Sequence, residues 1–138
     1  MTIFRRGESG DLAAIAAIQA ASPEAAQWDV AGYQGYQILV AVSGGCIAGF
    51  LVARPVDDRE CDLLNLAVAP GHRRQGIGRG LVRALLESRP GAAVFLEVRE
   101  SNQAARNLYR SLGFQEVSVR SQYYYLSLES AIVMKFYS

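Results

Sequence analysis

The sequence predicts an α/β protein, and three features of the chain support this. The spacing of apolar residues alternates along the chain between continuous runs typical of strands and the periodic spacing typical of helices. One strand-like run leads directly into the glycine-rich segment Ala69–Val82, which then turns into an apolar helical pattern. The 138 residues, of which 51% are hydrophobic, are enough for a substantial core. We therefore expect one domain over residues 1–138 with no linker.

The N-terminal part begins with a short strand, Thr2–Arg6, and continues into a helix within Glu8–Ser22. Apolar residues of that segment recur at helical spacing. Ser9 or Asp11 is available near its start as a cap.

A second, short and irregular helix is expected over Pro23–Tyr36, because proline suits the first turn of a helix and glycines end the segment. Tyr36–Val56 then contains two β-rich runs divided by Gly44 and Gly45, which predicts a hairpin. Asp57–Glu60 is predicted to be a charged turn.

The middle of the chain predicts a β-α-β-α unit. Cys61–Pro70 is almost continuously apolar, which indicates a strand buried on both faces. A helix follows from Gly76, with its apolar residues on one face, and ends at Arg89–Gly91.

The C-terminal part contains the rest of that unit and two further strands. Ala92–Val98 is another strand of the buried type, and a helix follows that begins with Ser101 or Asn102 and ends before Gly113. The tail, Phe114–Ser138, predicts two strands.

Charge and composition exclude several classes of partner. The chain has 14 basic and 13 acidic residues, a net charge of +1, so it has no overall field to attract nucleic acid or an anionic membrane. It contains no 18-residue apolar run and no export-signal pattern at its start. We expect a cytoplasmic protein that binds neither nucleic acid nor membrane.

The cysteines and the single histidine do not indicate a metal or nucleophile site. Cys46 and Cys61 lack metal-type spacing, and in a cytoplasmic chain they are expected to be reduced. A Cys-His nucleophile pair using His72 is disfavoured, because Cys61 opens a strand well before it and no orienting carboxylate is evident. We expect no metal site.

The segment Ala69–Val82 has the features of an anion-binding loop. Its strand–glycine turn–helix order leaves the first helical N–H groups without partners, where the helix dipole favours an anion. A P-loop is excluded because Ile77 and Gly78 stand where Lys and Ser or Thr are needed. A dinucleotide fingerprint is excluded because Leu81 replaces its third glycine. The alternative is a glycine-broken helix start with a solvated basic face.

Two motifs in this region resemble the GCN5-related N-acetyltransferase (GNAT) superfamily. Arg73-x-x-Gly76-x-Gly78 resembles its (Q/R)-x-x-G-x-(G/A) signature, and Leu96–Phe114, "LEVRESNQAARNLYRSLGF", resembles its second half. The resemblance is clear over Leu63–Phe114. It implies the GNAT fold, a mixed central sheet of about six to seven strands flanked by about four helices, and acetyl-CoA as acetyl donor.

Within the superfamily the chain looks most like the RimI-type ribosomal-protein alanine N-acetyltransferases. "NLAV" at Asn65–Val68 resembles their "NIAV", Trp28 stands for their N-terminal tryptophan, and the tail carries Arg120, Tyr123 and Tyr124 before "AIVMKF". Two departures are Gln27, where a proline is usual, and Ser130, where an aspartate is usual. Both lie where such enzymes are thought to receive the peptide.

The resemblance also implies the residues that hold acetyl-CoA. A splay of the strand at Leu66–Val68 would leave N–H groups free for the thioester carbonyl and the pantetheine amides, and the loop N–H groups would hold the pyrophosphate. The implied cofactor-binding residues are Leu66, Ala67, Val68, Arg73, Arg74, Gln75, Gly76, Ile77, Gly78, Arg79 and Asn102.

Glu97 is the candidate general base, acting directly or through a water. Strand alternation places its side chain opposite Leu96 and Val98, and a lone carboxylate in an apolar strand needs a task or a partner. The alternative is a strand-end glutamate paired with Arg99 or another arginine. An α-amine of pKa near 8 is partly neutral at about pH 7, so one moderate base suffices.

Tyr109 is the candidate general acid, because a phenol can protonate a departing thiolate. The alternative is packing, since Tyr109 belongs to an apolar stripe of its helix. Asn102 could cap that helix, hold the pantetheine arm, or do both.

Three functions remain open at this point. The first is acetylation of the N-terminal α-amine of a peptide or protein, with a ribosomal protein as one candidate. The second is acetylation of a small amine. The third is a non-catalytic acyl-CoA-binding module that uses Tyr123–Tyr125 to contact a partner. The sequence leaves open whether the protein is a monomer or a dimer.

Overall fold

The structure, a computed structural model, describes residues 1–124 and 129–137. The side chains of residues 121–124, like residue 125, lie outside this description, and so does the expectation for Tyr123–Tyr125. The strands are β1 (Thr2–Arg6), β2 (Gln37–Ser43), β3 (Cys46–Asp57), β4 (Glu60–Val68), β5 (Ala93–Arg99), β6 (Gln115–Tyr124) and β7 (Glu129–Phe136). The helices are α1 (Leu12–Ala20), α2 (Ile77–Ser88) and α3 (Gln103–Ser111), with 3₁₀ helices η1 (Ser9–Asp11), η2 (Val30–Gly35) and η3 (Pro70–His72).

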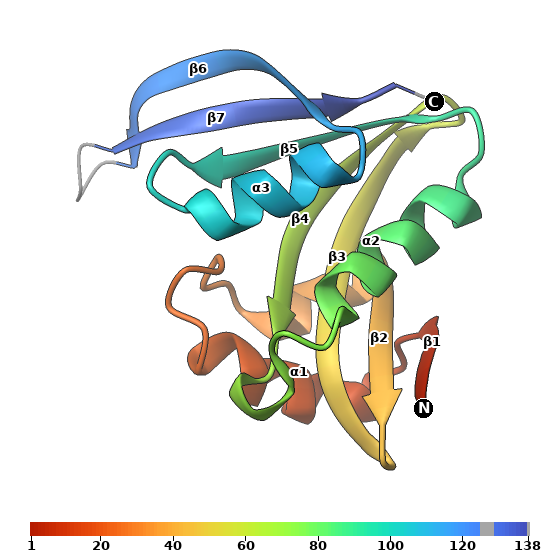
Figure 1. The fold of residues 1–138 in the computed structure, drawn as a ribbon. Coiled ribbons are helices and arrows are strands. Elements are labelled where there is room, and N and C mark those ends of the chain that lie inside the picture. Colours follow the sequence, from red (N-terminus) through yellow and green to blue (C-terminus); the bar gives the residue numbers. More distant parts are fainter. Residues whose placement is uncertain (125–128, 138) are drawn as a thin grey trace.

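All seven strands form one mixed sheet in the order β1-β2-β3-β4-β5-β7-β6. Neighbouring strands are antiparallel except β4 and β5, which are parallel and joined through α2. Figure 1 shows α2 and α3 along this sheet and α1 near the end of β4. The expected α/β fold with a mixed central sheet is confirmed, and the 3₁₀ helix η2 takes the place of a fourth α-helix.

Local sequence chemistry explains the hairpin and the end of α3. Gly44 and Gly45 both have positive φ, 59° and 79°, as a two-residue hairpin turn requires, and they join β2 to β3. Gly113, with φ of 105°, follows the end of α3.

Two expectations for the N-terminal part are wrong. The Asp11 side chain does not cap α1; it accepts from the Glu8 N–H at 2.8 Å and stabilises η1. The second helix begins at Val30 rather than at Pro23. The preceding segment stays irregular because the Gln27 side chain donates to backbone carbonyls of the turn after α1, so side-chain bonds replace helical ones.

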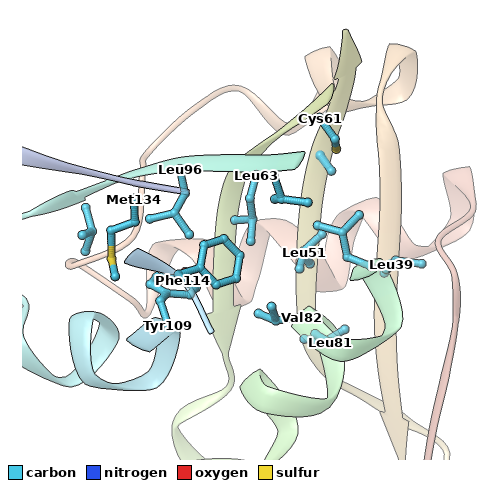
Figure 2. Packing of buried hydrophobic residues seen from close by; sticks show 14 of the residues in the cluster. Leu39, Leu51, Cys61, Leu63, Leu81, Val82, Leu96, Tyr109, Phe114 and Met134 are labelled. Atoms are coloured by element: carbon cyan, nitrogen blue, oxygen red, sulfur yellow. The ribbon is translucent and has the colours of Figure 1, made fainter. Parts of the chain in front are cut away.

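Two apolar clusters cover the two faces of the sheet. The larger cluster lies under α2 and α3 (Figure 2) and includes Leu39, Leu51, Leu81, Val82, Leu96, Tyr109, Phe114 and Met134. The smaller cluster lies under α1 and η2 and includes Ile15, Ile18, Tyr33, Ile38, Val40, Phe50, Val52 and Ala67. The sheet is therefore the middle layer of the molecule.

A β-bulge in β4 changes which residues face which cluster. The register to β3 skips Leu64, since Val52 pairs with Asn65 and Ala53 pairs with Leu63. Leu63 before the bulge packs in the larger cluster, whereas Asn65 after it points to the other face together with Ala67 of the smaller cluster. Both faces of β4 therefore pack against apolar clusters, as its composition predicts.

Candidate active site

The sheet opens between β4 and β5. These strands pair only from Glu60–Ala93 to Asp62–Phe95, although β4 continues to Val68 and β5 to Arg99. Figure 1 shows them diverging toward their C-terminal ends. The splay implied by the sequence resemblance is therefore present, and it leaves the edges of both strands unpaired with each other.

Two backbone N–H groups of β4 point into this opening. Ala69, just after β4, donates to β3 at 2.7 Å, and hydrogen bonds to one neighbour alternate along an antiparallel strand. Leu66 and Val68 therefore direct their N–H groups away from β3, toward β5. The same alternation directs the Ala67 N–H to β3 rather than into the opening.

The loop after β4 presents further N–H groups. Arg74 and Gly76 have φ of 65° and 77°, left-handed conformations that turn the chain sharply before α2. No side chain caps α2, and its first helical hydrogen bond runs from the Gly80 N–H to the Gly76 carbonyl at 3.0 Å. The N–H groups of residues 77–79 are thus free of intrahelical acceptors and suit an anion.

Arg73 and Arg79, two of the implied cofactor-binding residues, have protein partners for their side chains. The Arg73 guanidinium donates to the Val68 carbonyl at 3.2 Å, to Ser22 Oγ at 3.2 Å and to Glu24 at 3.3 Å. The Arg79 guanidinium donates to Ser111 Oγ at 2.8 Å, on α3. Both side chains bind protein groups here, so the backbone of the loop is the better candidate for anion contact.

Gly78 lies where α2, α3 and the end of β4 converge. A Cβ at this position would lie 3.6 Å from a Leu108 methyl and 3.7 Å from a Val68 methyl. Gln75 and Gly76 are exposed on the loop, and Ile77, the first residue of α2, is buried in the larger cluster. The loop is thus fixed to the core by its apolar residue while its backbone stays accessible.

Glu97 lies beside the opening, on the face of β5 opposite Leu96 and Val98, as predicted. Leu96 and Val98 are buried in the larger cluster, whereas 31% of the Glu97 side chain is exposed. Its carboxylate forms an ion pair with Arg120 of β6. The sequence left open a pairing of Glu97 with Arg99 or another arginine, and the structure shows Arg120 as its partner.

Tyr109 is buried from the other face, in the larger cluster. It is 6% exposed, and its ring packs against Phe114 at 5.5 Å between centroids (Figure 2). Burial raises the pKa of the Tyr109 phenol well above its ordinary value. Tyr109 therefore packs in the larger cluster, and its phenol is protonated at neutral pH.

Asn102 caps α3, since its side chain accepts from the Ala105 N–H at 3.2 Å. Of the two expected starts of this helix, Asn102 is the one observed, and the residue before it donates its N–H to Glu129 of β7 at 2.7 Å. The cap therefore anchors the helix that carries Tyr109.

Glu97 and Tyr109 lie on opposite faces of β5. Groups on opposite faces of a closed sheet are separated by the sheet itself, so they can act on one molecule only where the sheet is open. The diverging ends of β4 and β5 provide that opening, next to the Leu66 and Val68 N–H groups. The arrangement suits a reaction in which one reactant enters from each face.

The other candidate chemistry finds no support. Cys61 is buried at the start of β4 and His72 follows the end of that strand, so the two are far apart along β4. Burial also raises the pKa of the Cys61 thiol.

Among residues 1–124 and 129–137, no three His, Cys, Asp or Glu side chains form a group that could hold a metal. In the same part of the chain, no helix is long and apolar enough to cross a membrane.

Sequence reasoning missed a set of buried polar residues on the α1 face. Asn65, Gln19 and Tyr33 are 5%, 6% and 1% exposed and hydrogen-bond to one another. One signal could have pointed to them: Asn65 stands alone as an uncharged polar residue in an apolar strand, where a buried amide needs several partners.

These features place the chain in a known family. It belongs to the Acetyltransferase (GNAT) family, whose profile matches residues 11–114. It is therefore an acetyl-CoA-dependent N-acetyltransferase, as its sequence motifs predict.

The similarity to RimI-type enzymes extends over most of the chain. The chain is 43% identical over 107 residues to the ribosomal protein bS18-alanine N-acetyltransferase of Escherichia coli strain K12, covering 74% of this chain and 70% of that protein. It is 41% identical over 98 residues to the N-alpha-acetyltransferase RimI of Mycobacterium tuberculosis, covering 69% and 62%. The crystal structure of the Escherichia coli ribosomal-protein-S18-alanine N-acetyltransferase matches with a TM-score of 0.88 and 38% identity, covering 99% of this chain and 94% of that one.

Proposed function

We propose that this protein transfers acetyl from acetyl-CoA to the N-terminal α-amine of a protein, with an alanine-initiated ribosomal protein as the first candidate acceptor. The observation that carries the proposal is the opening between β4 and β5, with Glu97 on one face and Tyr109 on the other. The relatives named for alanine N-acetylation support the acceptor.

The proposed donor side uses backbone groups. The N–H groups of the loop and the first turn of α2 bind the pyrophosphate of acetyl-CoA. The Val68 N–H, which points into the opening, stabilises the oxyanion that develops on the thioester carbonyl. The fixed position of the loop on Ile77 keeps these donors in place before the ligand arrives.

The proposed transfer has two proton steps. Glu97 takes a proton from the acceptor amine, directly or through a water, as its nitrogen forms a bond to the thioester carbon. The carbon–sulfur bond then breaks, and the leaving thiolate takes the Tyr109 proton. Arg120 occupies the Glu97 carboxylate in an ion pair, so the acceptor amine must share this carboxylate with Arg120 or displace Arg120 from it. The cationic form of the entering amine can compete with Arg120 for the carboxylate.

The test is acetyl transfer, followed by thiol release, to short peptides that begin with alanine, serine or methionine, beside polyamines, lysine and aminoglycosides. Turnover on alanine-initiated peptides is expected. Turnover on small amines alone would overturn the N-terminal proposal. Acetyl-CoA binding without any turnover would instead favour the acyl-CoA-binding module.

The small-amine alternative gains no support from Gln27. Its side chain donates to the carbonyls of Gln19, Ser22 and Ala25 at 2.9, 2.9 and 3.3 Å, so it folds the turn after α1. This departure from the usual proline therefore has a structural explanation that requires no change of acceptor.

A further inference from the structure

A buried polar network joins the segment after α1 to the strand that borders the opening. We define the acceptor loop as Ser22–Trp28, the irregular segment between α1 and η2. Asn65 of β4 lies at the centre of the network, with Gln19 of α1 and Tyr33 of η2 beside it. All three are almost fully buried under the smaller cluster. Nothing in the proposed chemistry uses them directly.

The Asn65 carboxamide pairs with the backbone of the acceptor loop as a neighbouring strand would. Its Oδ1 accepts from the Ala26 N–H at 3.2 Å, and its Nδ2 donates to the Ala26 carbonyl at 2.9 Å. Both backbone groups of Ala26 therefore depend on this one side chain. The loop is held to β4 without forming a strand of its own.

The same oxygen also reaches the opening. Asn65 Oδ1 accepts from the Leu66 N–H at 3.0 Å, one of the two N–H groups that β4 directs toward β5. One side-chain amide thus sets both the position of the acceptor loop and the environment of a backbone donor in the site. Movement of the loop at Ala26 would change the hydrogen bonding of Leu66.

The rest of the acceptor loop is fixed at its two ends. Near its start, Ser22 and Glu24 accept from Arg73, the first residue of the anion-loop motif. At its end, the Trp28 carbonyl accepts from Gln19 Nε2 at 2.6 Å. Asn65 supplies the contact between these points. The loop is therefore held at three places, to Arg73, to Asn65 of β4 and to Gln19 of α1.

The network does more than fill space. An apolar side chain at position 65 would leave the Ala26 N–H and carbonyl without their partner, so the position of the loop depends on this amide. A fully satisfied buried network instead fixes one geometry. We infer that Asn65 is a positioning residue that holds the acceptor loop against the opening, and so sets the affinity for the acceptor. The inference rests on the proposed function.

The matched variants are Asn65→Ala, Tyr33→Phe and the control Ile15→Val. Asn65→Ala frees Ala26 and Leu66. Tyr33→Phe removes only the hydroxyl that joins Gln19 to Asn65. Ile15→Val loosens the same cluster without touching the network. All three are compared well below their melting temperatures, so that folded protein is measured.

Kinetics test the inference first. Asn65→Ala is expected to raise the KM for an alanine-initiated peptide about tenfold or more. The acetyl-CoA dissociation constant of this variant should change by less than about threefold. Tyr33→Phe should also raise the peptide KM, but by a smaller factor. A peptide KM for Asn65→Ala that moves no more than that of Ile15→Val would overturn the inference. If only small amines are turned over, the proposed function fails, and the KM for the best amine takes the peptide's place in the same comparison.

A second readout requires no turnover. Trp28 is the only tryptophan of the chain and is 47% exposed, so its fluorescence reports on the acceptor loop. Acrylamide quenching of Trp28 is expected to increase in Asn65→Ala and to stay unchanged in Ile15→Val. Equal quenching in both would show that the loop does not depend on Asn65.

Discussion

Glu97 is the residue whose substitution most directly tests the proposed chemistry. Glu97→Gln keeps the size of the side chain and its exposure beside Arg120 but removes the proton acceptor. We expect kcat to fall by about a hundredfold or more, the usual contribution of a positioned base. Acetyl-CoA binding, measured by calorimetry, should be unchanged.

The matched control for Glu97 is Asp11→Asn. Asp11 also forms an ion pair with an arginine, Arg5, but it lies in η1, away from the opening and from α3. Activity close to wild type is expected for this variant. If both variants lose activity equally, the loss in Glu97→Gln does not come from removal of a base.

Tyr109 gives a prediction about pH. Burial raises the pKa of its phenol, so the protonated form persists to higher pH than in an ordinary tyrosine. We therefore expect no alkaline decline in kcat from loss of this proton below about pH 10. Tyr109→Phe should lower kcat about tenfold or more at every pH, because the acid is absent throughout.

The fold of Tyr109→Phe should be retained, since the ring contact with Phe114 does not use the hydroxyl. Thermal melting checks this. A variant that melts normally and turns over at the wild-type rate would restrict Tyr109 to packing.

At the scale of the elements, Gly49 of β3 controls how closely α2 approaches the sheet. A Cβ there would lie 3.0 Å from the Ala67 carbonyl oxygen and 3.1 Å from an Ile77 methyl. Gly49→Ala must therefore shift the start of α2, at a cost of roughly 1–3 kcal/mol in the free energy of unfolding. It should also weaken acetyl-CoA binding, because the anion loop leads into that end of α2.

Urea unfolding and calorimetry measure these two effects. Gly10→Ala is the control, since a Cβ at Gly10 meets nothing within 4 Å. Unchanged affinity together with the loss of stability would mean that the anion loop adjusts independently of α2.

The elements differ in how far the sequence could predict them. The β2–β3 turn and the α3 cap are predictable because Gly44, Gly45 and Asn102 carry the required conformation or hydrogen bond themselves. The acceptor loop is not, because its shape depends on Asn65, which is 39 residues from Ala26 along the chain. Local propensity contains no information on such a partner.

The candidate site, like the elements, can be predicted from the sequence only in part. The anion loop and the orientation of Glu97 follow from glycine positions and strand alternation. The Glu97–Arg120 pair, 23 residues apart in sequence, follows only from the placement of β6 two strands away from β5. The bulge at Leu64 could not be predicted from the sequence of β4 either, because it arises from a mismatch in length between β4 and β3.

At the scale of the whole molecule, three carboxylates join segments that are separate in the fold. Asp11 binds Arg5 and so ties η1 to β1. Glu116 of β6 binds two arginines of α3, and Glu129 of β7 accepts from the backbone N–H of Ser101, just before α3. In each case hydrogen bonds from the partners are the first cause that lowers the pKa of the carboxyl. Two of these three contacts hold the helix that carries Tyr109.

These lowered pKa values determine how the stability of the fold depends on pH. A carboxyl with a lower pKa in the folded than in the unfolded chain stabilises the fold above its ordinary pKa, and this stabilisation is lost as pH falls through the folded value. Stability should therefore be flat near neutral pH and decline below about pH 4. Hydrogen exchange at low pH should increase first around α3 and β6, while α2 and β3, packed in the larger cluster, stay protected. Glu116→Gln should show the early exchange around α3 already at neutral pH, and uniform exchange over the whole sheet would contradict this local release.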